Sequence, residues 1–140
     1  MSFSVFINFN GNCREAVTFY ADVFGQPLPY FLTYGEGDAS FDKNVQVSEK
    51  SKDRIMNTGI MIAGTMVGFS DMPENFDFVR GNSMMLSITY DAMDIAEEAF
   101  TRLSENGDVH VEFDFVPGQG HYGMLTDQFG LTWAIRSILR

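Results

Sequence analysis

The sequence predicts an α+β fold of two βαβββ modules, because a pattern of strand and amphipathic helix occurs twice in 140 residues. In the first half, residues 5–9 read as a strand and residues 12–24 as the helix. In the second half, residues 84–90 read as a strand and residues 92–106 as the helix. A glycine follows each helix, as is common at helix C-termini. Each module is expected to curl its sheet into a half-open barrel cup, and a ligand is expected in the cavity that the cups share.

The first helix carries one apolar face. Asn12 and Glu15 predict an N-terminal cap pair, and Gly25 predicts the C-terminal stop. The apolar positions recur at helical spacing: Cys13, Ala16, Val17, Tyr20, Val23 and Phe24. We expect this face to pack against the first sheet.

Three further strands are expected in the first module. Residues 30–34 predict a short strand, and residues 55–62 and 65–69 predict a hairpin. Residues 41–54 are polar with few apolar anchors, which predicts a mobile excursion with at most a short helix or strand.

The second module repeats this plan. Asp91 is its expected N-cap, and the apolar positions of its helix are Ile95, Ala96, Ala99, Phe100 and Leu103. Apolar and polar side chains alternate over residues 109–115, which predicts a strand with one buried face. Residues 122–126 and 131–135 predict the closing hairpin.

The module boundaries follow from a linker at residues 71–82, which is rich in acids and contains a proline and a glycine. We therefore expect one domain over residues 1–140, with modules at about 1–71 and 82–140.

Composition excludes several classes of protein. A net charge of −10 repels phosphate backbones and disfavours nucleic-acid binding. No apolar run is long enough to span a membrane, and no signal peptide is evident. The single cysteine, Cys13, falls on the apolar face of the first helix and is expected to be a buried structural thiol. A cytoplasmic location is therefore expected.

Several motifs resemble the PhnB-like family of the glyoxalase/bleomycin-resistance/dihydroxybiphenyl-dioxygenase superfamily, also called vicinal oxygen chelate. They are residues 9–16 with Phe19-Tyr20 and residues 23–25, Ser70-Asp71 followed by Pro73, and residues 122–133. The resemblance covers nearly the whole chain and implies the glyoxalase/bleomycin-resistance fold. A methyltransferase is not expected, because no Gly-rich loop for a methyl donor joins a strand to a helix, and 140 residues are few for that fold.

The resemblance also implies positions where enzymes of the superfamily bind a divalent ion. These positions fall on Val5, on Met66 or Gly68, on Ser83 or Met84, and on Ala134, and a histidine of some relatives is replaced by Asn57. Such side chains are poor ligands for a divalent ion, so no metal and no other cofactor is expected.

The two histidines offer an alternative metal site. His110 and Glu112 share one face of a predicted strand, and with His121 they would complete a set of two histidines and a carboxylate. The alternation of this strand instead points His110 and Glu112 to solvent. His121, beside Tyr122, is either a ligand contact or a surface-loop histidine.

The predicted strands are rich in methionine and aromatic residues, which line adaptable apolar pockets or form ordinary core. The candidate ligand contacts are Asn8, Asn57, Met66, Trp133, His121 and Tyr122.

Two function classes remain. The first is a metal-free protein that binds a small apolar or aromatic molecule and assembles as a homodimer, with no nucleic-acid or membrane partner. The alternative is an enzyme, either a metal-dependent lyase, isomerase or dioxygenase of the same superfamily, or a metal-free catalyst.

Overall fold

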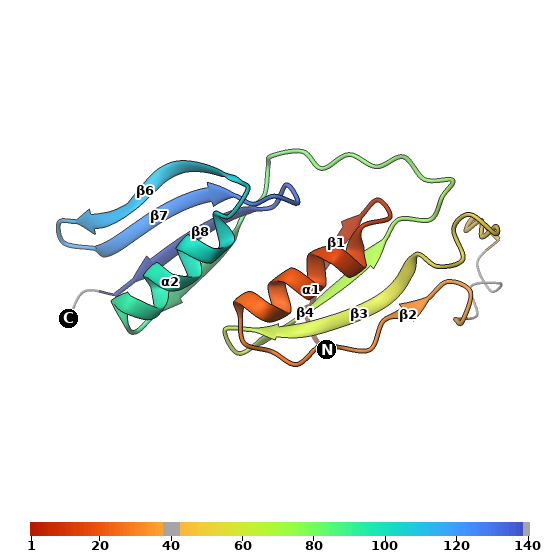
Figure 1. Cartoon of the computed structure of the whole chain (residues 1–140), viewed down its shortest axis with the longest axis horizontal. Helices are drawn as coiled ribbons and strands as arrows, with labels where there is room; N and C mark the ends of the chain where they lie inside the picture. The colour runs from red at the N-terminus through yellow and green to blue at the C-terminus, as the bar shows by residue number, and fades with distance from the viewer. Residues whose placement is uncertain (38–42, 139–140) are drawn as a thin grey trace. The chain divides into compact units, whose positions relative to one another are not determined.

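A computed structural model describes residues 1–37 and 43–138, and it contains the two predicted βαβββ units (Figure 1). Unit 1 is Met1–Val79 and unit 2 is Arg80–Arg140. Among the described residues, no helix is long and apolar enough to cross a membrane.

Unit 1 is a four-stranded mixed sheet with one helix. Its elements are β1 (Val5–Phe9), α1 (Cys13–Val23), β2 (Leu32–Thr33), β3 (Ile55–Ile62) and β4 (Thr65–Asp71). The strand order is β1-β4-β3-β2, in which only β1 and β4 are parallel.

The core of unit 1 lies between α1 and one face of this sheet (Figure 1). Tyr20 of α1 stacks on Phe69 of β4, with 5.8 Å between ring centroids, and Phe9 of β1 lies 6.3 Å from the same ring. Because side chains alternate along a strand, the neighbours of Phe69 point to the opposite face. We call that face the unit 1 open face; its side chains come from Phe6, Asn8, Asn57, Gly59, Met61, Met66, Gly68 and Ser70.

Unit 2 has the same plan. Its elements are β5 (Leu86–Tyr90), α2 (Met93–Leu103), β6 (Asp108–Val116), β7 (Gly120–Thr126) and β8 (Thr132–Ser137). The strand order is β5-β8-β7-β6, in which only β5 and β8 are parallel.

The core of unit 2 lies between α2 and its sheet. Phe100 of α2 lies over Gly123 and 5.7 Å from the ring of Phe113. Trp133 is 1% exposed on the same side. The unit 2 open face is the opposite side; its side chains come from Ser87, Thr89, Tyr122, Met124, Thr126, Thr132, Ala134 and Arg136.

Both predicted N-terminal caps are wrong. Asn12 makes no side-chain cap hydrogen bond. Instead one carboxylate oxygen of Asp71 accepts hydrogen bonds from the backbone N–H groups of Gly11 and Cys13, at 2.8 and 3.0 Å. Its other oxygen accepts from the N–H of Ile55 at 2.8 Å. Because β4 runs parallel to β1, its last residue arrives where α1 begins.

In unit 2 the helix is shorter than predicted at both ends. It starts at Met93, after an extended Ala92 at the N-cap position, so Asp91 lies one residue too early to cap it. The expected residues 104–106 continue as turn.

Strand β6 does not have the predicted buried face. Val109, Val111 and Phe115 are exposed, and the pairing with β7 shifts twice along the strand. Each shift breaks the strict alternation, and β6 is an edge strand, so little of the core reaches it.

The first module also differs from the prediction between β2 and β3. The expected strand at residues 30–34 is reduced to the two residues of β2. Residues 43–54 contain turns but no helix or strand, and residues 41 and 42 of the predicted excursion lie outside the described part of the chain.

Candidate functional site

The unit 1 open face begins with a row of polar side chains. Asn8 pairs with Ser70, whose hydroxyl donates a hydrogen bond of 2.6 Å to the Asn8 side-chain oxygen. Asn57 lies beside Ser70 in the next strand, since the following residue, Thr58, pairs with Phe69. Two amides and a hydroxyl therefore line up across three strands.

In the next row of the sheet, two of the three strands carry a glycine. Gly68 pairs with Gly59 on one side and with Phe6 on the other. A Cβ on Gly68 would lie 2.5 Å from the Phe6 ring, so this ring lies across the glycine. Phe6 is 56% exposed, which leaves one ring face open to a ligand.

Two methionines close the row beyond the glycines. Met61 and Met66 are cross-strand partners, 36% and 57% exposed. Flexible thioether side chains adapt to an apolar or aromatic surface. The unit 1 open face thus runs from amides, past the Phe6 ring over Gly68, to an apolar end. It brings together the predicted contacts Asn8, Asn57 and Met66.

On the unit 2 open face, three polar side chains from β6, β7 and β8 lie within hydrogen-bonding distance of one another in a row. A ring nitrogen of His110 lies 2.7 Å from the hydroxyl of Thr126, which lies 3.0 Å from that of Thr132. The predicted contact Tyr122 is further along the face, where the guanidinium of Arg136 lies 5.3 Å from its ring centroid.

The other two predicted contacts in unit 2 lie toward α2. Trp133 donates its indole N–H to Asp127 at 2.8 Å within the core. The His121 ring lies 5.6 Å from that of Phe113 and 5.7 Å from that of Phe115. The structure therefore does not bring Trp133 and His121 onto the face that carries Tyr122.

Two of the positions that the family resemblance implied for a divalent ion lie elsewhere than expected. Val5 lies on the side of the sheet that faces α1, because it pairs with the buried Val67, so Phe6 and Asn8 occupy the open face of β1. Ser83 and Met84 precede β5 and belong to no strand.

The donor set does not fit a divalent ion. Met66 and Gly68 do lie on the unit 1 open face, and Ala134 lies on that of unit 2. Within residues 1–37 and 43–138, no three His, Cys, Asp or Glu side chains group so as to hold a metal. Thioether, methyl and amide groups do not replace such a set.

Cys13 is a buried thiol, as predicted. Burial raises its pKa far above the ordinary value, and the negative charge of Asp71 adds to that effect. A thiol that stays protonated is a poor nucleophile.

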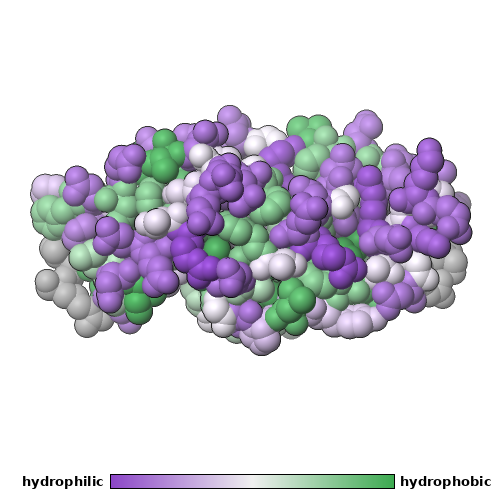
Figure 2. Space-filling view, in the orientation of Figure 1, coloured by the Kyte–Doolittle hydropathy of each residue, from purple (hydrophilic) through white to green (hydrophobic). Residues whose placement is uncertain are grey.

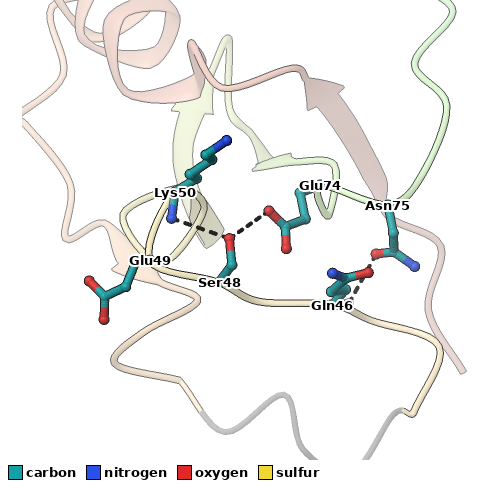
Figure 3. A pocket seen from close by; sticks show the side chains of 6 residues that line it. All are labelled: Gln46, Ser48, Glu49, Lys50, Glu74 and Asn75. Carbon is teal, nitrogen blue, oxygen red and sulfur yellow. Dashed lines mark hydrogen bonds between the residues drawn. The ribbon is translucent and has the colours of Figure 1, made fainter.

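Unit 1 also has a polar hollow of about 520 Å³, away from any predicted contact (Figure 3). The hydroxyl of Ser48 donates to one carboxylate oxygen of Glu74 at 2.8 Å, and the N–H of Gln46 donates to Asn75 at 3.0 Å. The second oxygen of Glu74 is buried without a hydrogen-bond partner among the described residues.

The surface mixes polar and apolar groups. On the side drawn in Figure 2, hydrophobic residues reach the surface in patches between hydrophilic ones. The exposed large apolar side chains include Phe6 and Met66 from the unit 1 open face. Exposed apolar patches are common at ligand and protein contacts.

Sequence reasoning missed Phe6, Ser70 and Arg136 on the open faces. Phe6 and Ser70 alternate with Phe9 and Phe69, but all of these segments are apolar enough to hide which face is buried. Arg136 carried a usable signal, since it is a lone charge within a strand whose other residues are Thr, Trp, Ala, Ile and Ser.

Comparison with known proteins gives matches over nearly the full length. The family model described as 3-demethylubiquinone-9 3-methyltransferase matches residues 1–136. Protein PA1353 from Pseudomonas aeruginosa is similar in structure, with a TM-score of 0.85 and 25% identity over 99% of this chain and 98% of that one.

Two further solved structures have the same fold. The PhnB protein from Bacillus cereus has a TM-score of 0.69 and 19% identity, over 98% of this chain and 99% of that one. A glyoxalase/bleomycin resistance protein/dioxygenase family enzyme from Burkholderia phytofirmans PsJN has a TM-score of 0.60 and 13% identity, over 97% of both chains.

Proposed function

This chain belongs to the family described as 3-demethylubiquinone-9 3-methyltransferase, and from that premise we propose that it is a metal-free small-molecule binding protein. It is PhnB-like, and its fold is the glyoxalase/bleomycin-resistance fold of the vicinal oxygen chelate superfamily. The proposed ligand is a small apolar or aromatic molecule.

The unit 1 open face is the observation that carries this proposal. It offers the exposed ring of Phe6, which lies across Gly68, with amides at one end of the face and methionines at the other. A planar apolar molecule would lie against the exposed Phe6 ring, contact Met61 and Met66, and direct a polar group to Asn8 and Asn57.

The fold does not match that of methyl-donor enzymes of the doubly wound type. Each unit has a mixed sheet with a single parallel pair, and the helix-covered side is filled by core side chains. Methyl-donor enzymes of the doubly wound type need a parallel sheet with a glycine-rich loop before a helix, which the described residues do not form.

The proposal is tested by titration with 2-naphthamide, a neutral planar probe, followed by calorimetry or ligand-observed NMR. Replacing Met66 with Ala should weaken binding about fivefold or more, since a buried thioether contact is lost. Met93→Ala on the exposed start of α2 is the matched control and should bind as the parent protein does. Equal affinity of both variants would contradict the proposal.

Assembly as a homodimer is part of the same proposal. β1 and β2 are the free edges of the unit 1 sheet in the described part of the chain. Tyr30 and Leu28, near β2, are largely exposed. A second copy would cover such surfaces, with residues 30–34 or the β3–β4 hairpin at the contact.

A further inference from the structure

Resting on the proposed function, we infer that the ligand of the unit 1 open face is an uncharged planar molecule with a carbonyl-type acceptor, to which the Asn8 amide donates. The proposed function leaves open whether the polar group of the ligand donates or accepts a hydrogen bond. The contact between Ser70 and Asn8 decides between the two, and both residues belong to unit 1.

Ser70 occupies the oxygen of the Asn8 side chain. The Ser70 hydroxyl lies 2.6 Å from that oxygen, which is a usual length for O–H···O and short for N–H···O. The hydroxyl therefore donates its only proton to Asn8 and has only lone pairs left to offer. The NH2 group of Asn8 remains as the donor of this pair.

The NH2 group of Asn8 is available to a ligand. Asn8 is exposed, and within residues 1–37 and 43–138 its NH2 group has no hydrogen-bond partner. Asn8 follows Phe6 on the same face of β1, about 7 Å along the strand. A molecule that lies against the Phe6 ring would therefore bring its polar end to this donor.

Asn57, the other amide of the row, sets no such preference. Its side chain makes no hydrogen bond in the described part of the chain, so the amide can turn and present either its oxygen or its NH2 group. Asn8 thus determines the specificity of the row, and Ser70 is the residue that positions it.

The unit 1 open face also suits an uncharged ligand. Its side chains are aromatic, amide, thioether and hydroxyl groups, and none of the residues that form it is charged. An ion bound there would lose water without gaining a partner of opposite charge. The net charge of −10 on the chain further disfavours an anion.

The test uses two probes of the same shape on the full chain. In 2-acetylnaphthalene the side group has a carbonyl oxygen, and in 2-isopropenylnaphthalene a CH2 group replaces that oxygen. Because water solvates the ketone better, the informative quantity is the ratio of the two affinities, measured by ligand-observed NMR and compared between the parent protein and its variants.

Asn8→Asp should lower the affinity ratio of ketone to hydrocarbon about fivefold. The carboxylate keeps the shape of the side chain and the oxygen that Ser70 uses, but it has no N–H to donate. Asn12→Asp is the matched control, because Asn12 is exposed, makes no cap hydrogen bond and undergoes the same change of charge. It should leave the ratio unchanged.

A second pair of variants tests the positioning role of Ser70. Ser70→Ala frees the Asn8 oxygen, so the amide can turn and the affinity ratio should fall in part. Ser70→Thr keeps the hydroxyl and should restore the ratio of the parent protein. Thermal melts check that each variant is folded.

The ligand's charge is tested with 2-naphthoate, which is anionic, against 2-naphthamide, which is neutral and of similar shape. The parent protein should bind 2-naphthoate several-fold more weakly. Tighter binding of 2-naphthoate would overturn the inference of an uncharged ligand.

The outcomes separate this inference from the proposed function. If both naphthalene probes bind in a Met66-dependent way and their affinity ratio is the same in Asn8→Asp as in the parent protein, the inference is wrong and the proposed function stands. If none of the four probes binds the parent protein, both are wrong.

Discussion

Two buried aspartates organise the chain at the scale of single residues. Asp71 accepts three backbone N–H groups in unit 1. Asp127 accepts the N–H groups of Phe129 and Leu131 and the indole of Trp133 in unit 2. Asp71 is the last residue of β4, and Asp127 directly follows β7. At the end of a strand a carboxylate can accept hydrogen bonds from N–H groups that have no partner in the sheet.

We expect Asp71→Asn to lower the free energy of unfolding by about 3 kcal/mol, because an amide leaves a buried N–H of α1 or of Ile55 unpaired. Urea unfolding followed by circular dichroism measures this change. The control is Asp77→Asn in the exposed linker, which should change stability by less than about 0.5 kcal/mol. Similar losses in the two variants would show that Asp71 does not organise unit 1.

Cys13 should resist thiol reagents in the folded protein. Because burial and Asp71 raise its pKa, the thiol stays protonated at pH 8, and it should react with a thiol reagent only after urea unfolding. The unfolded thiol releases its proton near pH 8.5, so stability should also fall as the pH rises above that value. Rapid labelling of the folded chain would contradict the buried position, and Cys13→Ala should abolish labelling in either state.

The elements show how far sequence reasoning reaches. Both helices and the β3–β4 hairpin were predictable, because their apolar positions recur with a period of 3.6 or 2. Gly25 follows the end of α1 with a positive φ, as predicted, but after α2 the residue with a positive φ is Asn106 and not Gly107. The N-terminal cap of α1 was not predictable from the sequence, because the residue that accepts its hydrogen bonds, Asp71, is 58 residues from Cys13. The buried side of β8 was also hidden, because Trp133, Ala134 and Ile135 are apolar on both faces.

Two strand glycines should differ in their tolerance of alanine. A Cβ on Gly123 would lie 2.6 Å from the Phe100 ring and 2.9 Å from the Phe113 Cα, and Phe100 is buried between α2 and the sheet. We expect Gly123→Ala to cost about 2 kcal/mol of stability, measured by urea unfolding. The atoms nearest to a Cβ on Gly68 belong to the exposed Phe6 ring, which can rotate away, so Gly68→Ala should cost much less. The reverse order would contradict the assignment of covered and open faces.

The whole molecule is expected to be a homodimer of this 15.8 kDa chain. Light scattering at micromolar concentration should give twice that mass. Leu28→Lys or Tyr30→Lys, near the free edge at β2, should shift the mass toward one chain, whereas a charge added at the exposed Ile95 of α2 should not. A single-chain mass for the unmodified protein would reject the dimer.

The most direct test of a metal-free site is a thermal melt of chelator-treated protein with zinc, nickel, manganese or iron(II). A metal at about one hundred times its dissociation constant would add about 2.7 kcal/mol, which a melt detects easily. Because the open faces carry Asn8, Asn57, Met66 and Ala134 in place of a ligand set, we expect no metal to raise the melting temperature, while 2-naphthamide does. A metal-induced rise of several degrees that His110→Ala or His121→Ala abolishes would contradict the account.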